Sequence, residues 1–232
     1  MNLIDQSFLY LLLMILSISY PLLNSFEQKI KFINYWKALF PSIIIMMMIF
    51  IPWDIWFTSV GVWSFNKNYI IGYFILNLPI EEWLFFIFIP FCCVFIHEVL
   101  NYYFPINIIN LSSRFVRFFS IILFLISILF ISKLYTFCVL IITAISVFVI
   151  SFQNKIFIND LIRTYLVSLV PFLLVNGVLT GSFNSPVVIY NSQEIINIRL
   201  FNIPFEDFLY CFSMLSLTIL PYEIFKKNYL YN

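Results

Sequence analysis

The sequence has 232 residues, of which 63% are hydrophobic and only 10% are charged, and its formal net charge at pH 7 is +1. Soluble domains average about 45–50% apolar and about 25% charged residues, so this composition excludes an ordinary soluble protein and indicates an integral membrane protein. The near-neutral charge gives no reason to expect a nucleic-acid partner, and the 30 Phe and 14 Tyr favour apolar partners.

A membrane-spanning helix needs about 20 mainly apolar residues. Seven segments meet this requirement, at residues 7 to 24, 38 to 57, 79 to 104, 115 to 132, 134 to 152, 161 to 180 and 204 to 225. The loops on one side of these segments and the C-terminal tail carry nine Lys and Arg residues, against three on the other side. By the positive-inside rule we expect a multi-pass protein of a bacterial-type inner membrane, with its N-terminus outside and its C-terminus in the cytoplasm.

The chain contains an internal duplication. Residues 77 to 85, Asn-Leu-Pro-Ile-Glu-Glu-Trp-Leu-Phe, recur at 202 to 210 as Asn-Ile-Pro-Phe-Glu-Asp-Phe-Leu-Tyr, an offset of 125, and Glu98 falls on Glu223 at the same offset. Residues 25 to 30 match 151 to 156, Pro52 matches Pro171, and 64 to 66 match 182 to 184. Ordered matches of this kind indicate a repeat.

The predicted fold is therefore an all-α membrane protein with seven transmembrane helices. Residues 1–110 form the first three-helix repeat, 111–132 a connector helix, and 133–232 the second repeat. Because one added helix restores the orientation of the second copy, we expect the two repeats to be parallel. A pseudo-twofold axis along the membrane normal then brings their acidic pairs together.

Each copy of the repeated motif places two acids in the first turn of a helix: Glu81 and Glu82, then Glu206 and Asp207. Ionisable groups inside a membrane are costly, so they are a functional-site hypothesis by default. We expect up to four carboxyl groups to face one apolar cavity. Burial and like charges both favour the neutral acid, so one carboxyl can hold a proton while a neighbour is ionised, which supplies an acid and a base. The alternative is a structural site, or a proton-coupled transporter or apolar small-molecule binding protein, with the acids paired to Lys67 or Arg199.

Aromatic side chains surround the acidic pairs. Each one by itself more often packs in the core or lies at the membrane interface. Together they suit a cation, because an aromatic face attracts positive charge by about 0.5 to 2 kcal/mol without trapping it. The candidates for substrate binding are Trp83, Phe85, Phe86, Phe208 and Tyr210.

Other polar residues in the spans allow more than one role. Asp54 could be catalytic, a partner of the acids, or interfacial, and Asn176 suits hydrogen bonding between helices as well as a ligand. His97 beside Glu98 is weak evidence for a metal, so no metal site is predicted. The four glycines form no dinucleotide or nucleotide loop, which predicts chemistry without such a cofactor and without net redox change.

The doubled motif Pro79-x-Glu81-Glu82-Trp83 and Pro204-x-Glu206-Asp207-Phe208, each opening the last helix of its three-helix repeat, resembles the membrane lycopene cyclase domain in its fused, duplicated form. Residues 53 to 57, 61 to 66 and 174 to 181 resemble the stretches that precede the motif in that family. The resemblance covers essentially the whole chain.

The resemblance implies a lycopene β-cyclase, an intramolecular lyase that converts the ψ-ends of lycopene to β-ionone rings through γ-carotene to β-carotene. A carboxylic acid among Glu81, Glu82, Glu206 and Asp207 would protonate the terminal double bond, and a carboxylate would remove a proton after ring closure. The partners implied are lycopene or a related linear carotenoid and the lipid bilayer, and no cofactor. Whether the chain forms a homo-oligomer or associates with other carotenoid enzymes stays open. A related membrane prenyl-transfer enzyme ranks lower, because no diphosphate-binding aspartate cluster is present.

Overall fold

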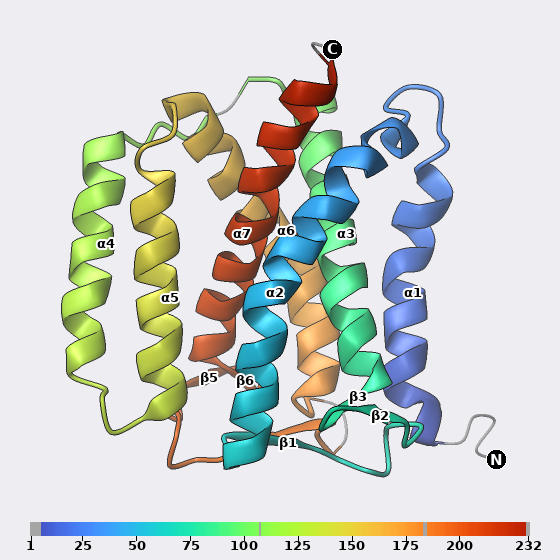
Figure 1. The fold of residues 1–232 in the computed structure, drawn as a ribbon, viewed down its shortest axis with the longest axis vertical. Helices are drawn as coiled ribbons and strands as arrows, with labels where there is room; N and C mark the ends of the chain where they lie inside the picture. Colours follow the sequence, from blue (N-terminus) through green and yellow to red (C-terminus); the bar gives the residue numbers. More distant parts are fainter. Residues whose placement is uncertain (1–5, 107, 183–184, 231–232) are drawn as a thin grey trace.

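The computed structural model describes residues 6–106, 108–182 and 185–230. Its described part is a bundle of α-helices that run roughly parallel to one long axis, with short strands gathered at one end (Figure 1). The helices are α1 (Leu9–Asn24), α2 (Trp36–Val60), α3 (Ile80–Tyr103), α4 (Ser113–Ile128), α5 (Leu134–Ile150), α6 (Lys155–Leu179) and α7 (Phe205–Leu230), with 3-10 turns at Gln6–Phe8 and Phe32–Tyr35. The strands are β1 (Trp63–Phe65), β2 (Phe74–Ile75), β3 (Leu78–Pro79), β4 (Val188–Tyr190), β5 (Arg199–Leu200) and β6 (Ile203–Pro204).

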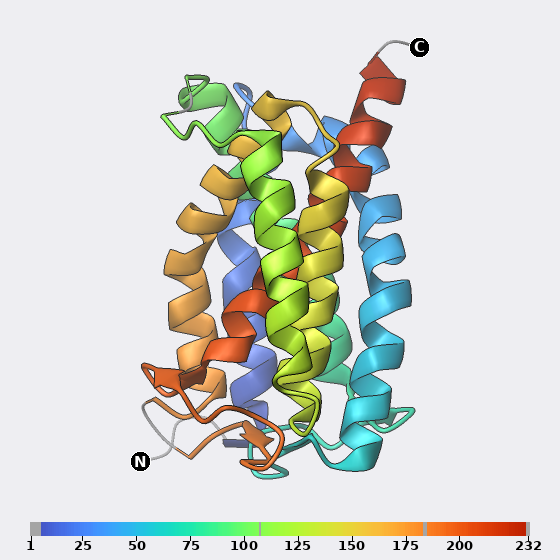
Figure 2. The ribbon, with the colours of Figure 1, turned by 90° about the vertical axis from the view of Figure 1, so that its left-hand side faces the viewer.

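Five of these helices are long and apolar enough to cross a membrane: α1 with its preceding turn, α2 with its preceding turn, α3, α6 and α7. The other two, α4 and α5, have 16 and 17 residues and are shorter than a standard span. They pack closely on each other, and α4 lies at the outer edge of the bundle (Figures 1 and 2). Large apolar side chains point outward, for example Leu125 on α4 and Leu174 on α6, which suits lipid contact.

The start of the sixth predicted segment differs most from the structure. The sixth segment was expected from residue 161, but α6 begins at Lys155. Asn154 caps the helix, because its side chain accepts a hydrogen bond from the Phe157 amide at 2.8 Å. The first turns of α6 carry Lys155, Asp160 and Arg163, so hydropathy alone places the start of this helix too late.

The two repeats agree in detail. Helices α1, α2 and α3 correspond to α5, α6 and α7, and each pair runs in the same direction (Figure 1). The hairpin β2–β3 before α3 corresponds to β5–β6 before α7. Even unusual backbone conformations repeat at the offset of 125: Leu76 and Phe201 both have positive φ, as do Gly72 and Asn197. Asn is among the side chains that best tolerate the left-handed region, so it can replace Gly here.

The repeats meet around a pseudo-twofold axis. Strand β1 pairs antiparallel with β4, with Ser64 opposite Ile189 at the same offset of 125. Two strands related by a twofold axis perpendicular to their sheet must be antiparallel, so this pair lies on the axis. The structural counterpart of β1 is thus β4 and not residues 182 to 184, of which 183 and 184 lie outside the described residues. Helix α2 also packs more on α7 than on α3, so the two repeats interlock.

Candidate active site

The acidic pairs open α3 and α7, as the motif predicts, but the two acids of each pair point to different places. Glu81 and Glu206 face the loops that precede their helices. The Ile71 amide donates to Glu81 Oε1 at 2.7 Å, and the Ile196 amide donates to Glu206 Oε1 at 2.8 Å. Both carboxyls are buried and neither lines the cavity described below. Their contacts fix the strand-containing loops onto the helix ends.

Glu82 and Asp207 face the inside of the bundle instead. Each receives a hydrogen bond from a tyrosine at the start of the first helix of its repeat. Tyr10 donates to Glu82 Oε2 at 2.7 Å, and Tyr135 donates to Asp207 Oδ1 at 2.8 Å. These tyrosines are themselves 125 residues apart, so the duplication repeats the whole acid–tyrosine pair.

Beyond the tyrosine, the two acids differ in their partners. Asp207 Oδ2 accepts further hydrogen bonds from Asn176 Nδ2 at 2.7 Å and from the Tyr190 hydroxyl at 2.9 Å. Burial and the neighbouring Asp207 raise the pKa of Tyr190 well above its usual value, so this hydroxyl stays protonated and remains a donor. Asp207 therefore has three donors around one carboxyl group.

Glu82 has a second carboxyl group beside it. Asp54, on α2, interacts directly with Glu82 and accepts a hydrogen bond from Trp63 Nε1 at 2.7 Å. Two carboxyl groups in contact can be joined by one shared proton. Among the described residues, no Lys or Arg forms an ion pair with Asp54, Glu82 or Asp207. The site thus holds three buried carboxyls that pair with no Lys or Arg in the described part of the chain.

These carboxyls line one cavity of about 1050 Å³, counted with the part that opens to the outside. Aromatic rings lie around the acids, among them Trp63, Phe85 and Tyr210. The rest of the wall is mainly apolar, so the cavity combines acid–base groups with surfaces that can stabilise a cation.

The structure thus brings together part of the predicted site. The residues that line the cavity are Asp54, Glu82, Phe85, Asn176, Asp207 and Tyr210. The residues that lie elsewhere are Glu81, Trp83, Phe86, Phe208 and Glu206. Of these, Phe86 is fully buried in the core, Trp83 donates to the Ile75 carbonyl, and Phe208 packs on Phe172.

The sequence reasoning did not identify Tyr10, Tyr135 and Tyr190 as site residues. The spacing of Tyr10 and Tyr135 was a usable signal, because it equals the offset of the acidic motifs. Tyr190 had no such signal, since its counterpart at this offset is Phe65. Only the pairing of β1 with β4 places it beside Asp207.

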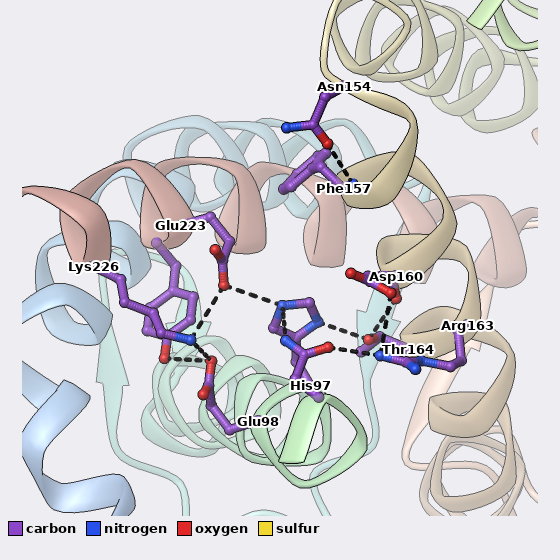
Figure 3. A network of polar contacts seen from close by, with 11 residues as sticks. His97, Glu98, Asn154, Phe157, Asp160, Arg163, Thr164, Glu223 and Lys226 are labelled. Carbon is purple, nitrogen blue, oxygen red and sulfur yellow. Dashed lines mark hydrogen bonds and ion pairs between the residues drawn. The ribbon is translucent and has the colours of Figure 1, made fainter. Parts of the chain in front are cut away.

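A second polar cluster lies at the opposite end of the bundle, where α3, α6 and α7 meet (Figure 3). His97 Nε2 contacts Glu223 Oε1 at 3.3 Å, and the Tyr222 hydroxyl donates to Glu98 Oε1 at 2.9 Å. Tyr222 is the counterpart of His97 at the offset of 125, and Glu223 is the counterpart of Glu98. Each contact therefore joins a glutamate on one of the helices α3 and α7 to the His or Tyr on the other. Their ligand atoms could hold a metal, since His97, Glu98 and Glu223 lie within 4.8 Å of one another. Lys226 Nζ, however, lies 2.5 Å from Glu98 Oε1 and 3.5 Å from Glu223 Oε1, so an ammonium group already compensates both carboxylates.

The fold and the site define a multi-pass membrane protein, duplicated internally, with an apolar cavity that contains acid and base groups. Comparison with known families agrees. The model of the family described as lycopene cyclase matches residues 7–100 and 132–225, two segments whose ends are again 125 residues apart. The matches cover most of the chain, so the chain belongs to the lycopene cyclase family. Membership implies an isomerase that cyclises a carotenoid. No curated protein and no solved structure matches the chain.

Proposed function

We propose that this chain is a lycopene β-cyclase, which forms β-ionone rings from the ψ-ends of lycopene through γ-carotene to β-carotene. The observation that carries the proposal is the meeting of three uncompensated carboxyls, Asp54, Glu82 and Asp207, in one apolar cavity with aromatic walls. A family whose reaction adds one proton and later removes one needs an acid and a base within reach of the same chain end.

The partners of the carboxyls suggest a division of roles. The Asp54–Glu82 pair holds the shared proton and delivers it to the terminal double bond of the substrate. The neighbouring double bond attacks the cation, the ring closes, and the faces of Phe85 and Tyr210 stabilise the positive charge. Asp207, oriented by three donors, removes the final proton and sets the position of the ring double bond. One proton is gained and one lost, so no redox cofactor takes part.

The other two acids of the motif have a positioning role in this proposal. Glu81 and Glu206 hold the Ile71 and Ile196 amides, and through them the loops that close the cavity end of the bundle. The charge of these acids is not needed for that contact, because an amide oxygen also accepts a hydrogen bond.

We also infer that all seven helices cross the membrane, in two repeats over 1–110 and 133–232 joined by a connector over 111–132. Helices α4 and α5 run beside the longer helices along the same axis (Figure 2). The nine Lys and Arg residues of the positive side belong to the end of the bundle opposite the three carboxyls, so the N-terminus and the carboxyls lie toward the outer face.

The test is pigment analysis in cells that accumulate lycopene. The unchanged chain should produce γ- and β-carotene. Glu82→Gln and Asp207→Asn should each lower conversion by about 10²-fold or more, as expected for loss of an acid or base. Glu81→Gln and Glu206→Gln make the same chemical change one residue away and should keep conversion within a few-fold.

Equal amounts of each variant in the membrane are the control for folding. If lycopene is not converted although the chain without substitutions is present in the membrane in normal amount, the proposed activity is refuted. Equal losses in Glu81→Gln and Glu82→Gln would refute the division of roles.

A further inference from the structure

The cavity is long rather than round. Its wall on α3 includes Glu82, Phe85, Ile89, Cys92 and Ile96, a spacing that follows one face of the helix. This stripe extends roughly 21 Å at 1.5 Å per residue. The carboxyls lie at one end of it, so the remainder can accommodate an extended chain whose tip reaches the acids.

The cavity reaches the surface between α1 and α6. Both helices pack on α3, but they hardly touch each other. The lining residues at this gap are not covered: Ser17 on α1 and Val175 on α6 are partly exposed, and Pro171 is exposed. Leu16, Val170 and Leu174 beside them are apolar and more than half exposed, so the gap faces lipid.

The pseudo-twofold axis relates this gap to a second one, between α5 and α2. A shallow groove lies there, lined by Trp53, Trp56, Ile142 and neighbouring side chains, and α7 runs behind it (Figure 1). Ile142 corresponds to Ser17 at the offset of 125. Trp53 and Trp56 correspond to Phe172 and Val175 at the offset of 119 that relates Pro52 to Pro171.

The second groove does not reach the carboxyls. It shares no lining residue with the cavity. Trp53 packs between Phe57 and Tyr210, with ring centroids 5.5 Å and 5.1 Å away, and Tyr210 is itself a wall of the cavity. Its counterpart Phe172 packs on Phe208 instead, at 5.0 Å, and leaves the first gap open.

We propose that the cavity has a single lateral entrance, between α1 and α6, through which a linear polyene enters from the bilayer, and that Trp53 and Trp56 close the equivalent entrance between α2 and α5. The proposal rests on the proposed function and deepens it. With one entrance, the two repeats serve one chain end at a time, so a substrate with two ψ-ends must leave and re-enter the site between its two cyclisations.

The experiment fills each opening with tryptophan. Ser17→Trp narrows the proposed entrance from the side of α1. Val175→Trp narrows it from the side of α6, with the same side chain that α2 has at the equivalent position, Trp56. Ile142→Trp is the matched control in the second groove. All are produced in lycopene-accumulating cells, with two readouts per amount of membrane protein: conversion to cyclic carotenoid, and lycopene that co-purifies with the detergent-extracted chain, measured by visible absorption.

Both entrance variants should lower conversion and total bound carotenoid at least tenfold, and Ile142→Trp should stay within twofold of the unchanged chain. The proposal is overturned if Ile142→Trp is as harmful as Ser17→Trp at equal abundance, or if neither entrance variant lowers either readout. Because the two entrance variants lie on different helices, a folding defect in one of them does not prevent the test with the other. If the unchanged chain binds lycopene without converting it, the proposed activity fails, while the bound pigment still tests the entrance.

Discussion

Tyr10 and Tyr135 occupy equivalent positions and donate to equivalent acids, but their surroundings differ. Tyr135 is one of three donors to Asp207, whereas Tyr10 shares Glu82 only with a second acid, Asp54. The duplication therefore supplied two similar acid–tyrosine pairs, and residues outside the motif made them unequal. Asp54 has a leucine, Leu173, as its counterpart in the second repeat, so only one half can form the carboxyl pair.

The unequal surroundings predict unequal effects of removing the two hydroxyls. Tyr10→Phe should lower cyclisation by about 10- to 100-fold, because a buried hydrogen bond to a charged group contributes about 1.5–3 kcal/mol. Tyr135→Phe should lower it less than tenfold, because two donors remain on Asp207. Initial rates of pigment conversion in isolated membranes, at matched protein amounts, show which of the two substitutions lowers cyclisation more. A larger loss of activity for Tyr135→Phe than for Tyr10→Phe would contradict the inference that Asp207 depends less on its tyrosine than Glu82 does.

Helices α3 and α7 each carry one acid of the proposed site at one end. At the other end they are tied to each other by His97, Glu98, Tyr222 and Glu223. Lys226 lies among them and compensates both glutamates. This arrangement fixes the spacing of the two helices at the end opposite the carboxyls of the cavity, so we assign the cluster to stability and not to chemistry.

Removing the central cation should therefore destabilise the helix pair. Lys226→Met removes the ammonium group that both largely buried carboxylates share, and breaking a buried ion pair costs about 3–5 kcal/mol. We expect a clear fall in the temperature at which the detergent-solubilised protein loses its monodisperse peak in size-exclusion chromatography. Lys227→Met is the matched control, because Lys227 is exposed and should leave that temperature unchanged. Equal effects of the two substitutions would show that Lys226 has no special role.

At the scale of the whole molecule, the cavity belongs to neither repeat alone. Glu82 comes from the first repeat and Asp207 from the second, and α2 and α6 each pack against the opposite repeat's last helix. The connector α4 packs mainly on α5 and contributes no residue to the cavity wall, which suits a purely topological role.

This arrangement predicts that the chain can be divided after the connector. Co-expression of residues 1–132 with residues 133–232 should restore conversion of lycopene, because both pieces keep their orientation and the interlocking helices bring the acids together. Each piece alone should give none. A first piece that ends at 110 lacks α4 and so tests whether this helix is needed at all. Activity from either piece alone would contradict a site shared between the repeats.

The sequence alone was enough for the repeat, the parallel orientation of its copies and the positions of the acidic motifs, because hydropathy and a constant offset are properties of the chain itself. The direction of individual side chains could not be obtained in this way. Glu81 and Glu82 are neighbours on one helical turn, about 100° apart, and nothing in their local sequence says which one faces the loop. The same holds for Trp83, Phe86 and Phe208, whose aromatic character is equally suited to core and cavity.

The amino-acid sequence by itself determined that this is a duplicated helical membrane protein with acids at the starts of two equivalent helices, since composition and periodicity fix which segments enter lipid. Only the tertiary structure decided that Asp54 lies beside Glu82, that Tyr190 on β4 reaches Asp207, and that the cavity is lined from α1 and α6 but not from the equivalent groove between α5 and α2. These features depend on packing between different helices and strands, where small differences such as Trp53 in place of Phe172 break the symmetry that the duplication established.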